Sequence, residues 1–254
     1  MALIKLTRSF EQGIASRAST EIPFRVLGYA TGIGASLVDV SPVGGVYVFP
    51  PAGGIQMQIV SDSANDVVTT GTGARVVTIV YLDQLYVEHT ITVNMNGKTP
   101  VATTPTNIFR INRFYTSASG SIQAPDGNIT LQNIAGTINY SKILVGFNNS
   151  CQAIFTIPLA NTGYLTAWQI GSGQPTSLSN YATARLMATT NRLDELISLF
   201  DIKDITIVQS NQQMFTYPIP FKFPEKTDIK VSVIASGGTT FIASTGLHGW
   251  YEPQ

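Results

Sequence analysis

The residues that most often carry out chemistry in proteins are scarce in this chain and widely separated. Its 254 residues include two histidines, His89 and His248, and one cysteine, Cys151. A metal site needs several nitrogen, oxygen or sulfur ligands that converge. His89 directly follows Glu88 in a strand-like segment, so these two side chains are expected on opposite faces. A metal shared by the two histidines is therefore disfavoured, and the sequence predicts no metal, no cofactor and no catalytic residue.

One acidic loop could bind a cation. The segment SDSAND places Asp62 and Asp66 around Ser63 and Asn65, a spacing that oxygen ligands of calcium sometimes have. It lacks the glycine and the terminal bidentate glutamate of the common calcium loop. A turn in which Asp and Asn side chains accept hydrogen bonds from backbone N–H groups is the favoured interpretation.

A glycine-rich loop could bind phosphate. The segment TGTGAR, residues 70–75, has the glycines that allow a backbone to approach an anion. A phosphate loop also needs a following helix whose N-terminus faces the anion. Here β-branched residues follow, so the segment is predicted to be a turn, with Arg75 paired to Asp83 or Asp66.

Cysteine and aromatic residues are the remaining side chains of interest. Cys151 lies in the alternating apolar segment CQAIFTI, which favours a buried, inert thiol over a reactive one. Four aromatic side chains could form a sugar-stacking platform, as in lectin-like sandwiches, or could equally serve a core or a subunit interface. They are Tyr164, Trp168, Trp250 and Tyr251.

Composition restricts the partners of the protein. Charged residues make up 12% of the chain, hydrophobic residues 44%, and the net charge is zero. Such a chain is globular, and its neutral polar surface suits close packing of copies. Because no block of Lys or Arg could neutralise a row of phosphates, no direct nucleic-acid binding is expected. No apolar run is long enough to span a bilayer, so no membrane partner is expected either.

The chain ends of this sequence give expectations about location. The start, MALIKLTRSFEQ, lacks the apolar core of a signal peptide, which predicts synthesis in a cytoplasm. Residues 1–23 are predicted to be an N-terminal arm that orders on a partner, or else a frayed tail.

Period-two alternation predicts an all-β fold. About a dozen strand-like segments recur roughly every ten residues, which is typical of a sandwich or barrel. We predict a jelly-roll-like antiparallel β-sandwich over residues 24–254, with a subdivision near residues 136–150 left open. Residues 194–200, DELISLF, have helical spacing, whereas the β-branched residues after them favour a strand.

Several pairings are predicted from turns between alternating segments. Residues 55–93 are expected to form a three-stranded meander. Residues 107–115 are expected to form a central strand with one face against the core and the other against a partner or a second layer. Three pairs of segments are expected to be neighbours across turns, and one proline-rich segment is expected to be an irregular crossover. The pairs are 36–40 with 46–49, 151–157 with 164–170, and 228–235 with 239–244, and the crossover is YPIPFKFPEKTD, residues 217–228.

A succession of short motifs resembles a group of virion structural proteins from tailed phages and related large DNA viruses. It covers roughly residues 50–170 and consists of SDSxxD, GTGAR and YLD, the turn at Asn96 to Pro100, the strand NIFRIN, and GFNNSCQAIFTIP. The resemblance implies a particle component without catalysis. It does not distinguish head from tail, and it transfers no functional residues.

Together these observations predict a non-enzymatic virion structural protein. It is expected to be a capsid component (a decoration, minor or shell subunit) that self-associates as a trimer and contacts other virion proteins within the virion. The alternative is a tail or receptor-binding module that recognises host carbohydrate. A cupin-like enzyme is disfavoured because its clustered metal ligands are missing.

Overall fold

The computed structural model describes residues 20–173, 180–190, 199–237 and 241–254, in which every regular element is a β-strand. The predicted N-terminal arm lies almost entirely outside these residues, as does most of the segment 194–200. All strand pairs are antiparallel. The predicted all-β antiparallel fold class is confirmed.

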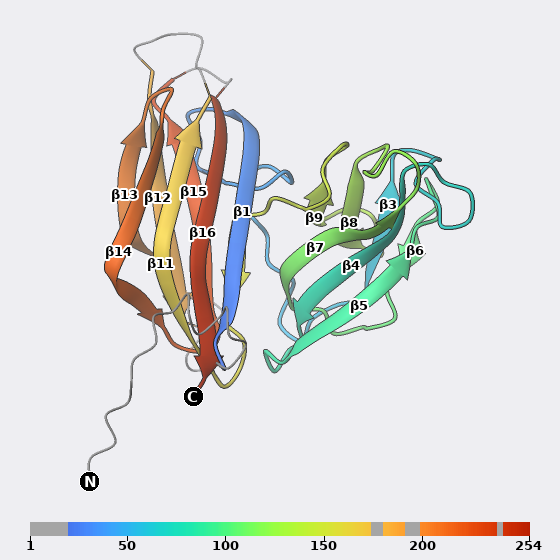
Figure 1. Ribbon diagram of the computed structural model, residues 1–254, viewed down its shortest axis with the longest axis horizontal. Coiled ribbons are helices and arrows are strands. Elements are labelled where there is room, and N and C mark those ends of the chain that lie inside the picture. The colour runs from blue at the N-terminus through green and yellow to red at the C-terminus, as the bar shows by residue number, and fades with distance from the viewer. Residues whose placement is uncertain (1–19, 174–179, 191–198, 238–240) are drawn as a thin grey trace.

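The larger lobe is a sandwich of two sheets (Figure 1). One sheet has the order β1 (Ile22–Ile33), β16 (Phe241–Pro253), β11 (Asn161–Ser172), β14 (Gln212–Phe223). The other has the order β10 (Ile154–Thr156), β15 (Thr227–Ala235), β12 (Ala182–Thr190), β13 (Asp201–Val208), with β2 (Val38–Asp39) also paired to β15. Most connections in this lobe cross from one sheet to the other, whereas the consecutive strands β12 and β13 pair within one sheet. We call this the sandwich lobe.

The core of the sandwich lobe comes from the inward-facing residues of these alternating strands. Along β1, for example, Phe24, Val26 and Ala30 are buried while Arg25 and Leu27 are exposed. Trp168 and Phe241 are the largest fully buried side chains of this core. Period-two patterning therefore decides which face of each strand is covered.

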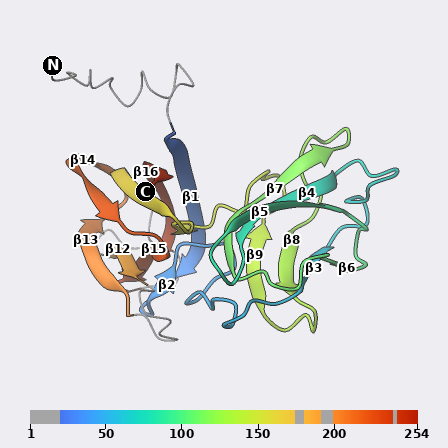
Figure 2. The same cartoon turned by 90° about the horizontal axis from the view of Figure 1, so that it is seen from below.

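The smaller lobe is inserted between β2 and β10 and has a separate hydrophobic core. Its sheets have the orders β6 (Val101–Ala102), β3 (Met57–Ser61), β8 (Ile129–Asn133), β9 (Asn139–Ile143), and β5 (Glu88–Asn94), β4 (Ala74–Leu82), β7 (Arg110–Ser119). Figures 1 and 2 show this inserted lobe beside β1, on the opposite side of the sandwich lobe from β13 and β14. The possible subdivision near residues 136–150 stays a prediction; β9 in that range still belongs to the inserted lobe, and the chain next forms a strand of the sandwich lobe at β10.

The predicted meander over residues 55–93 is wrong in one of its two pairings. Strands β4 and β5 pair as expected, but β3 pairs with β6 and β8 in the opposite sheet. Strands in both sheets of a sandwich show the same alternation of buried and exposed residues. Alternation therefore does not distinguish two strands that pair in one sheet from two strands that lie in opposite sheets.

The same ambiguity accounts for two other wrong pairings. Strands β10 and β11 lie in opposite sheets, and so do β15 and β16. Gly44 and Gly45 adopt the positive φ values expected of a tight turn, 81° and 68°. The segment 46–49 that follows them forms no strand, so the predicted pairing of 36–40 with 46–49 is wrong; the backbone N–H of Tyr47 donates to the Asp39 side chain (2.7 Å).

The proline-rich segment is part of an edge strand, not an irregular crossover. Pro218 and Pro220 lie in β14, where the register with β11 jumps from Phe221 to Thr216. The prolines thus occupy a bulge at a sheet edge, where their missing N–H groups leave no ladder bond unmade.

Strand β7 lies at the edge of its sheet, not at its centre. As expected for a strand with two covered faces, it buries Phe114 in the inserted-lobe core while Arg110 and Asn112 contact the sandwich lobe.

Candidate functional site

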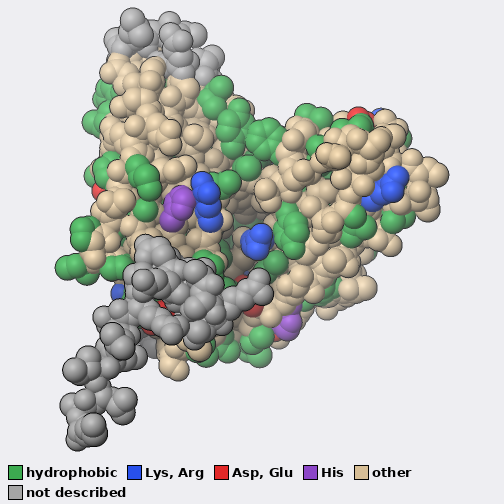
Figure 3. Space-filling view, viewed as in Figure 1, with side chains coloured by type: hydrophobic (Ala, Val, Ile, Leu, Met, Phe, Trp, Pro, Cys, Tyr) green, Lys and Arg blue, Asp and Glu red, His purple; other side chains and the backbone are tan. Residues whose placement is uncertain are grey.

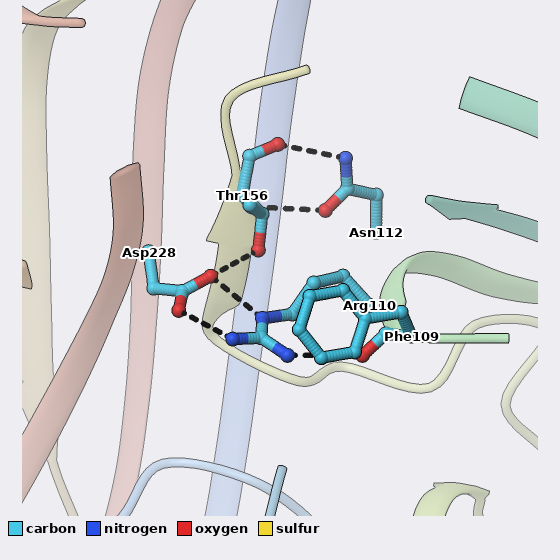
Figure 4. Close-up of polar contacts among 5 residues, drawn as sticks. All are labelled: Phe109, Arg110, Asn112, Thr156 and Asp228. Atoms are coloured by element: carbon cyan, nitrogen blue, oxygen red, sulfur yellow. Dashed lines mark hydrogen bonds and ion pairs between the residues drawn. The ribbon is translucent and has the colours of Figure 1, made fainter. Parts of the chain in front are cut away.

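A buried ion pair joins the two lobes (Figure 4). Arg110 of β7 donates from Nε to Oδ1 of Asp228 (2.9 Å) and from Nη2 to Oδ2 (3.1 Å). The Thr156 hydroxyl also donates to Asp228 Oδ1, at 2.6 Å. The third guanidinium nitrogen, Nη1, donates to the carbonyl of Phe109 (3.1 Å). This two-bond geometry fixes the orientation as well as the distance of the groups.

Neighbouring contacts extend this junction. The Arg110 guanidinium lies over the rings of Phe109 and Phe49, 4.0 and 4.5 Å from their centroids. The Asn112 amide forms two hydrogen bonds with the backbone of Thr156, each of 2.9 Å. These buried contacts connect β7 of the inserted lobe to β10 and β15 of the sandwich lobe.

A cleft of about 720 Å³ lies beside the junction, between β1 and β16 on one side and β4, β5 and β7 on the other. Figure 3 shows the hollow between the lobes, with basic side chains and a histidine close to it. The volume is that of a small-molecule site. A smaller hollow of about 170 Å³ shares Arg25, Asn112 and Arg113 with it and reaches Cys151. We call the larger hollow the interlobe cleft.

Positive charge predominates in the interlobe cleft. Arg25 of β1 lies opposite His248 of β16 in the ladder, and Arg113 projects from β7. Neither arginine forms a salt bridge with a carboxylate of the described residues. Glu88 is the acidic lining residue, and it accepts a hydrogen bond of 3.4 Å from the Tyr251 hydroxyl.

His248 has an unusual environment in the cleft. Its Nε2 atom is buried and has no hydrogen-bond partner within the part of the chain that the structure describes. Burial lowers the pKa of His248, and the nearby Arg25 guanidinium lowers it further. The imidazole is therefore neutral at pH 7.

The other predicted histidine lies outside the interlobe cleft. His89 Nε2 is 3.0 Å from Asp83 Oδ2, and its ring stacks on Tyr81. Across the described ranges, no three His, Cys, Asp or Glu side chains are grouped so that they could hold a metal ion.

The acidic loop is held by its own carboxylates. Asp66 is fully buried and accepts hydrogen bonds from the backbone N–H of Ala74 (2.6 Å), Asp126 (2.9 Å) and Gly127 (3.0 Å). Asp62 accepts from the N–H of Asn128 (2.6 Å). The Asp side chains accept backbone N–H hydrogen bonds, as predicted. Most of the donors, however, belong to the turn at residues 126–128 and not to the loop itself.

The glycine-rich loop packs against this carboxylate. A Cβ on Gly73 would overlap Asp66 Oδ1, so the glycine is needed for close approach. Arg75 does not pair with Asp66 or Asp83: its Nε donates to the Gly71 carbonyl (2.9 Å), and Asp83 instead contacts His89. The strand β4 follows, as expected for a turn.

Cys151 and the four aromatic residues do not form a common site. Cys151 is half-buried, not fully buried as expected, and this partial burial raises the pKa of its thiol, which disfavours the reactive thiolate. Trp168 is fully buried and donates from Nε1 to the Thr245 hydroxyl (3.0 Å), and Tyr251 packs near Phe155. Only Tyr164 and Trp250 stack on each other, with centroids 5.0 Å apart. The four rings therefore do not form one platform.

Sequence reasoning missed Arg25 and Arg113. Each is an isolated basic residue within an alternating strand, and no motif marks it. Their proximity depends on how the two lobes dock, which alternation in the sequence does not encode.

No family model and no curated protein matches this chain. Two solved structures are similar to it at a low level. One is described as the 2.6 Å structure of infectious bursal virus derived T=1 particles, with 8% identity, coverage of 92% of this chain and 74% of that chain, and a TM-score of 0.21. The other is the structure of infectious bursal disease virus Gt strain, with 10% identity, coverage of 91% and 75%, and a TM-score of 0.13. Such scores do not establish a common fold.

No helix in the described ranges has the length and apolar character needed to cross a membrane.

Proposed function

We propose that this chain is a non-enzymatic structural subunit of a virus particle and that it self-associates through one edge of the sandwich lobe. The observation that carries the proposal is an exposed apolar edge where β13 and β14 end their sheets. We call it the β13–β14 edge, and it consists of Ile202, Ile205, Ile207, Met214 and Ile219.

This edge has the properties of a contact surface. Ile219 is 89% exposed, and Met214 and Ile207 are 60% and 58% exposed. Edge strands with exposed apolar side chains promote pairing with other chains and are normally protected by charge or by covering segments. Within the described residues, β13 and β14 each leave one strand edge unpaired, and the same two strands carry the exposed apolar side chains, which favours burial against a partner.

A second copy of the chain is the partner that fits best. Asp201, Lys203 and Asp204 place both signs of charge along β13, so the edge is compatible with itself. The inserted lobe lies on the other side of the sandwich, next to β1, and would not obstruct the contact. Low charge over the whole chain reduces repulsion between copies.

The assignment to a virus particle has two supports. The motifs GTGAR and YLD resemble those of virion structural proteins, and the jelly-roll-like strand order is one that viral capsid proteins use, along with lectins and cupins. Within this proposal the chain is a capsid component in the virion, forms trimers and contacts other virion proteins, without direct contact to nucleic acid.

Light scattering coupled to size-exclusion chromatography tests the self-association. The wild type is expected to elute as an oligomer, and Ile205→Asp as a folded monomer. Leu85→Asp is the matched control, because Leu85 is 63% exposed on the inserted lobe, and it should remain oligomeric. A wild type that is monomeric at every concentration, or an unchanged Ile205→Asp oligomer, would refute the proposed edge.

Carbohydrate recognition by a tail or receptor-binding module is the second candidate. The stacked Tyr164 and Trp250 rings favour it, since partly exposed aromatic faces bind sugars. Glycan-array binding by the wild type that Trp250→Ala abolishes would support this candidate, and the absence of any bound glycan would remove it.

A further inference from the structure

We propose that the interlobe cleft binds a small organic monoanion, a carboxylate carried on an apolar or sugar-like body. This inference is independent of the self-association edge, which lies on the far side of the sandwich lobe.

The first step is the convergence of cationic groups from both lobes. Arg25 comes from the sandwich lobe and Arg113 from the inserted lobe, and both line the same cleft. Arg113 has a ring contact with Tyr115, at 5.1 Å from the centroid, and neither arginine has a carboxylate within salt-bridge distance among the described residues. Guanidinium groups bind carboxylates through paired N–H donors, so these two groups are suited to hold one from opposite sides.

The second step is the charge balance. With Glu88 ionised, Arg25 and Arg113 contribute +2, Glu88 contributes −1 and the neutral His248 contributes none, so the lining carries a net charge of +1. Burial raises the pKa of Glu88 and the nearby Arg113 guanidinium lowers it, so protonation of Glu88 would only make the lining more positive. A monoanion neutralises this charge, whereas a dianion would leave an excess next to Glu88. Nucleic acid would require a row of cations, which the chain does not contain.

The third step is the character of the walls. Across the sheet of the inserted lobe, Val80 lies between Thr90 and Arg113 in the ladder, so their side chains share one face. Phe24, Phe155 and Tyr251 line the opposite side. An apolar or ring-shaped body therefore has surfaces to pack on, and Thr90 supplies a hydroxyl on the same face for a polar group.

Calorimetric titration of the full chain at low salt tests the proposal, with glucuronate and benzoate as probes. Glucose and benzyl alcohol are their uncharged counterparts. We expect at least one carboxylate to bind, with its uncharged counterpart at least tenfold weaker. Binding of glucuronate indicates an acidic sugar as the ligand class, and binding of benzoate indicates an apolar acid.

Variants then locate the site. Arg25→Gln and Arg113→Gln should each weaken binding about tenfold to a hundredfold, as expected for loss of a charge-assisted hydrogen bond. Lys98→Gln removes one exposed positive charge from a turn outside the cleft and should change affinity less than twofold. Thermal melting of each variant checks its fold. The proposal is overturned if neither carboxylate binds at 10 mM, if uncharged counterparts bind equally well, or if both folded arginine variants bind like wild type.

Discussion

At the scale of residues, the Arg110–Asp228 ion pair links the inserted lobe to the sandwich lobe. Both partners are buried, with exposures of 7% and 2%. Removing one partner of a buried pair leaves the other charged and desolvated, which costs about 3–5 kcal/mol.

We therefore expect Asp228→Asn to lower the free energy of unfolding by about 3–5 kcal/mol in denaturant titrations. Asp201→Asn is the control, because Asp201 forms only an exposed pair with Lys203 (3.5 Å), and its loss should change stability by about 1 kcal/mol or less. Equal effects of the two substitutions would contradict a structural role for the junction.

The second residue-scale prediction concerns the inserted lobe. Asp66→Asn replaces a fully buried carboxylate that accepts three backbone N–H groups and the Ser61 hydroxyl. An amide offers one oxygen and presents its NH₂ to donors, so we expect a loss of about 2–4 kcal/mol. Asp62→Asn, at an exposed position of the same loop, should cost about 1 kcal/mol. Hydrogen exchange of the N–H groups of residues 126 and 127 provides the readout, and unchanged protection in Asp66→Asn would disprove the assignment.

The third prediction is a pH dependence from His248. Its folded-state pKa lies below the value of about 6.5 expected in an unfolded chain. As the pH falls below about 6.5, His248 binds a proton more readily in the unfolded chain than in the folded chain. The folded protein therefore loses stability at acidic pH. Between pH 7.5 and pH 5 the free energy of unfolding should therefore fall more for the wild type than for His248→Gln. A difference that is constant with pH would show that His248 titrates normally.

Residue roles were predictable where a local pattern encodes them. The acidic loop and the glycines of GTGAR were recognisable as a turn from their residue types alone. The roles of Arg25, Arg113 and Arg110 were not, because each of these side chains meets its neighbours only after the lobes dock.

At the scale of elements, strand positions were predictable and strand partners were not. Alternation identified β4, β5, β12 and β13 nearly to their ends. The pairings of β3, β10 and β15 were wrong because a sandwich buries one face of every strand, whichever sheet it joins.

A prediction at this scale concerns the bulge between β11 and β16. A Cβ on Gly249 would overlap the Tyr164 carbonyl oxygen and lie 2.8 Å from the Phe24 ring. Gly249→Ala should lower stability by about 2–3 kcal/mol, because backbone atoms have little freedom to move aside. Gly237→Ala, whose nearest neighbour is Asn180 at 3.4 Å, should change stability by about 0.5 kcal/mol or less in the same thermal melts. A Gly249→Ala protein as stable as wild type would argue against the close strand approach.

At the scale of the whole molecule, two separate cores and one charge-lined cleft follow from the insertion of a second lobe into a β-sandwich. The sequence predicted the all-β class from composition and alternation. It did not predict the second core, because the inserted residues have the same alternating pattern as the rest of the chain.

The central claim is that copies of this chain pack through the β13–β14 edge. The most direct measurement is a cryo-electron microscopy map of the assembled protein, resolved well enough to trace strands. We predict that Ile205, Ile207 and Ile219 are buried between copies and that the inserted lobe is free of this contact. An assembly in which these three side chains face solvent would contradict the claim.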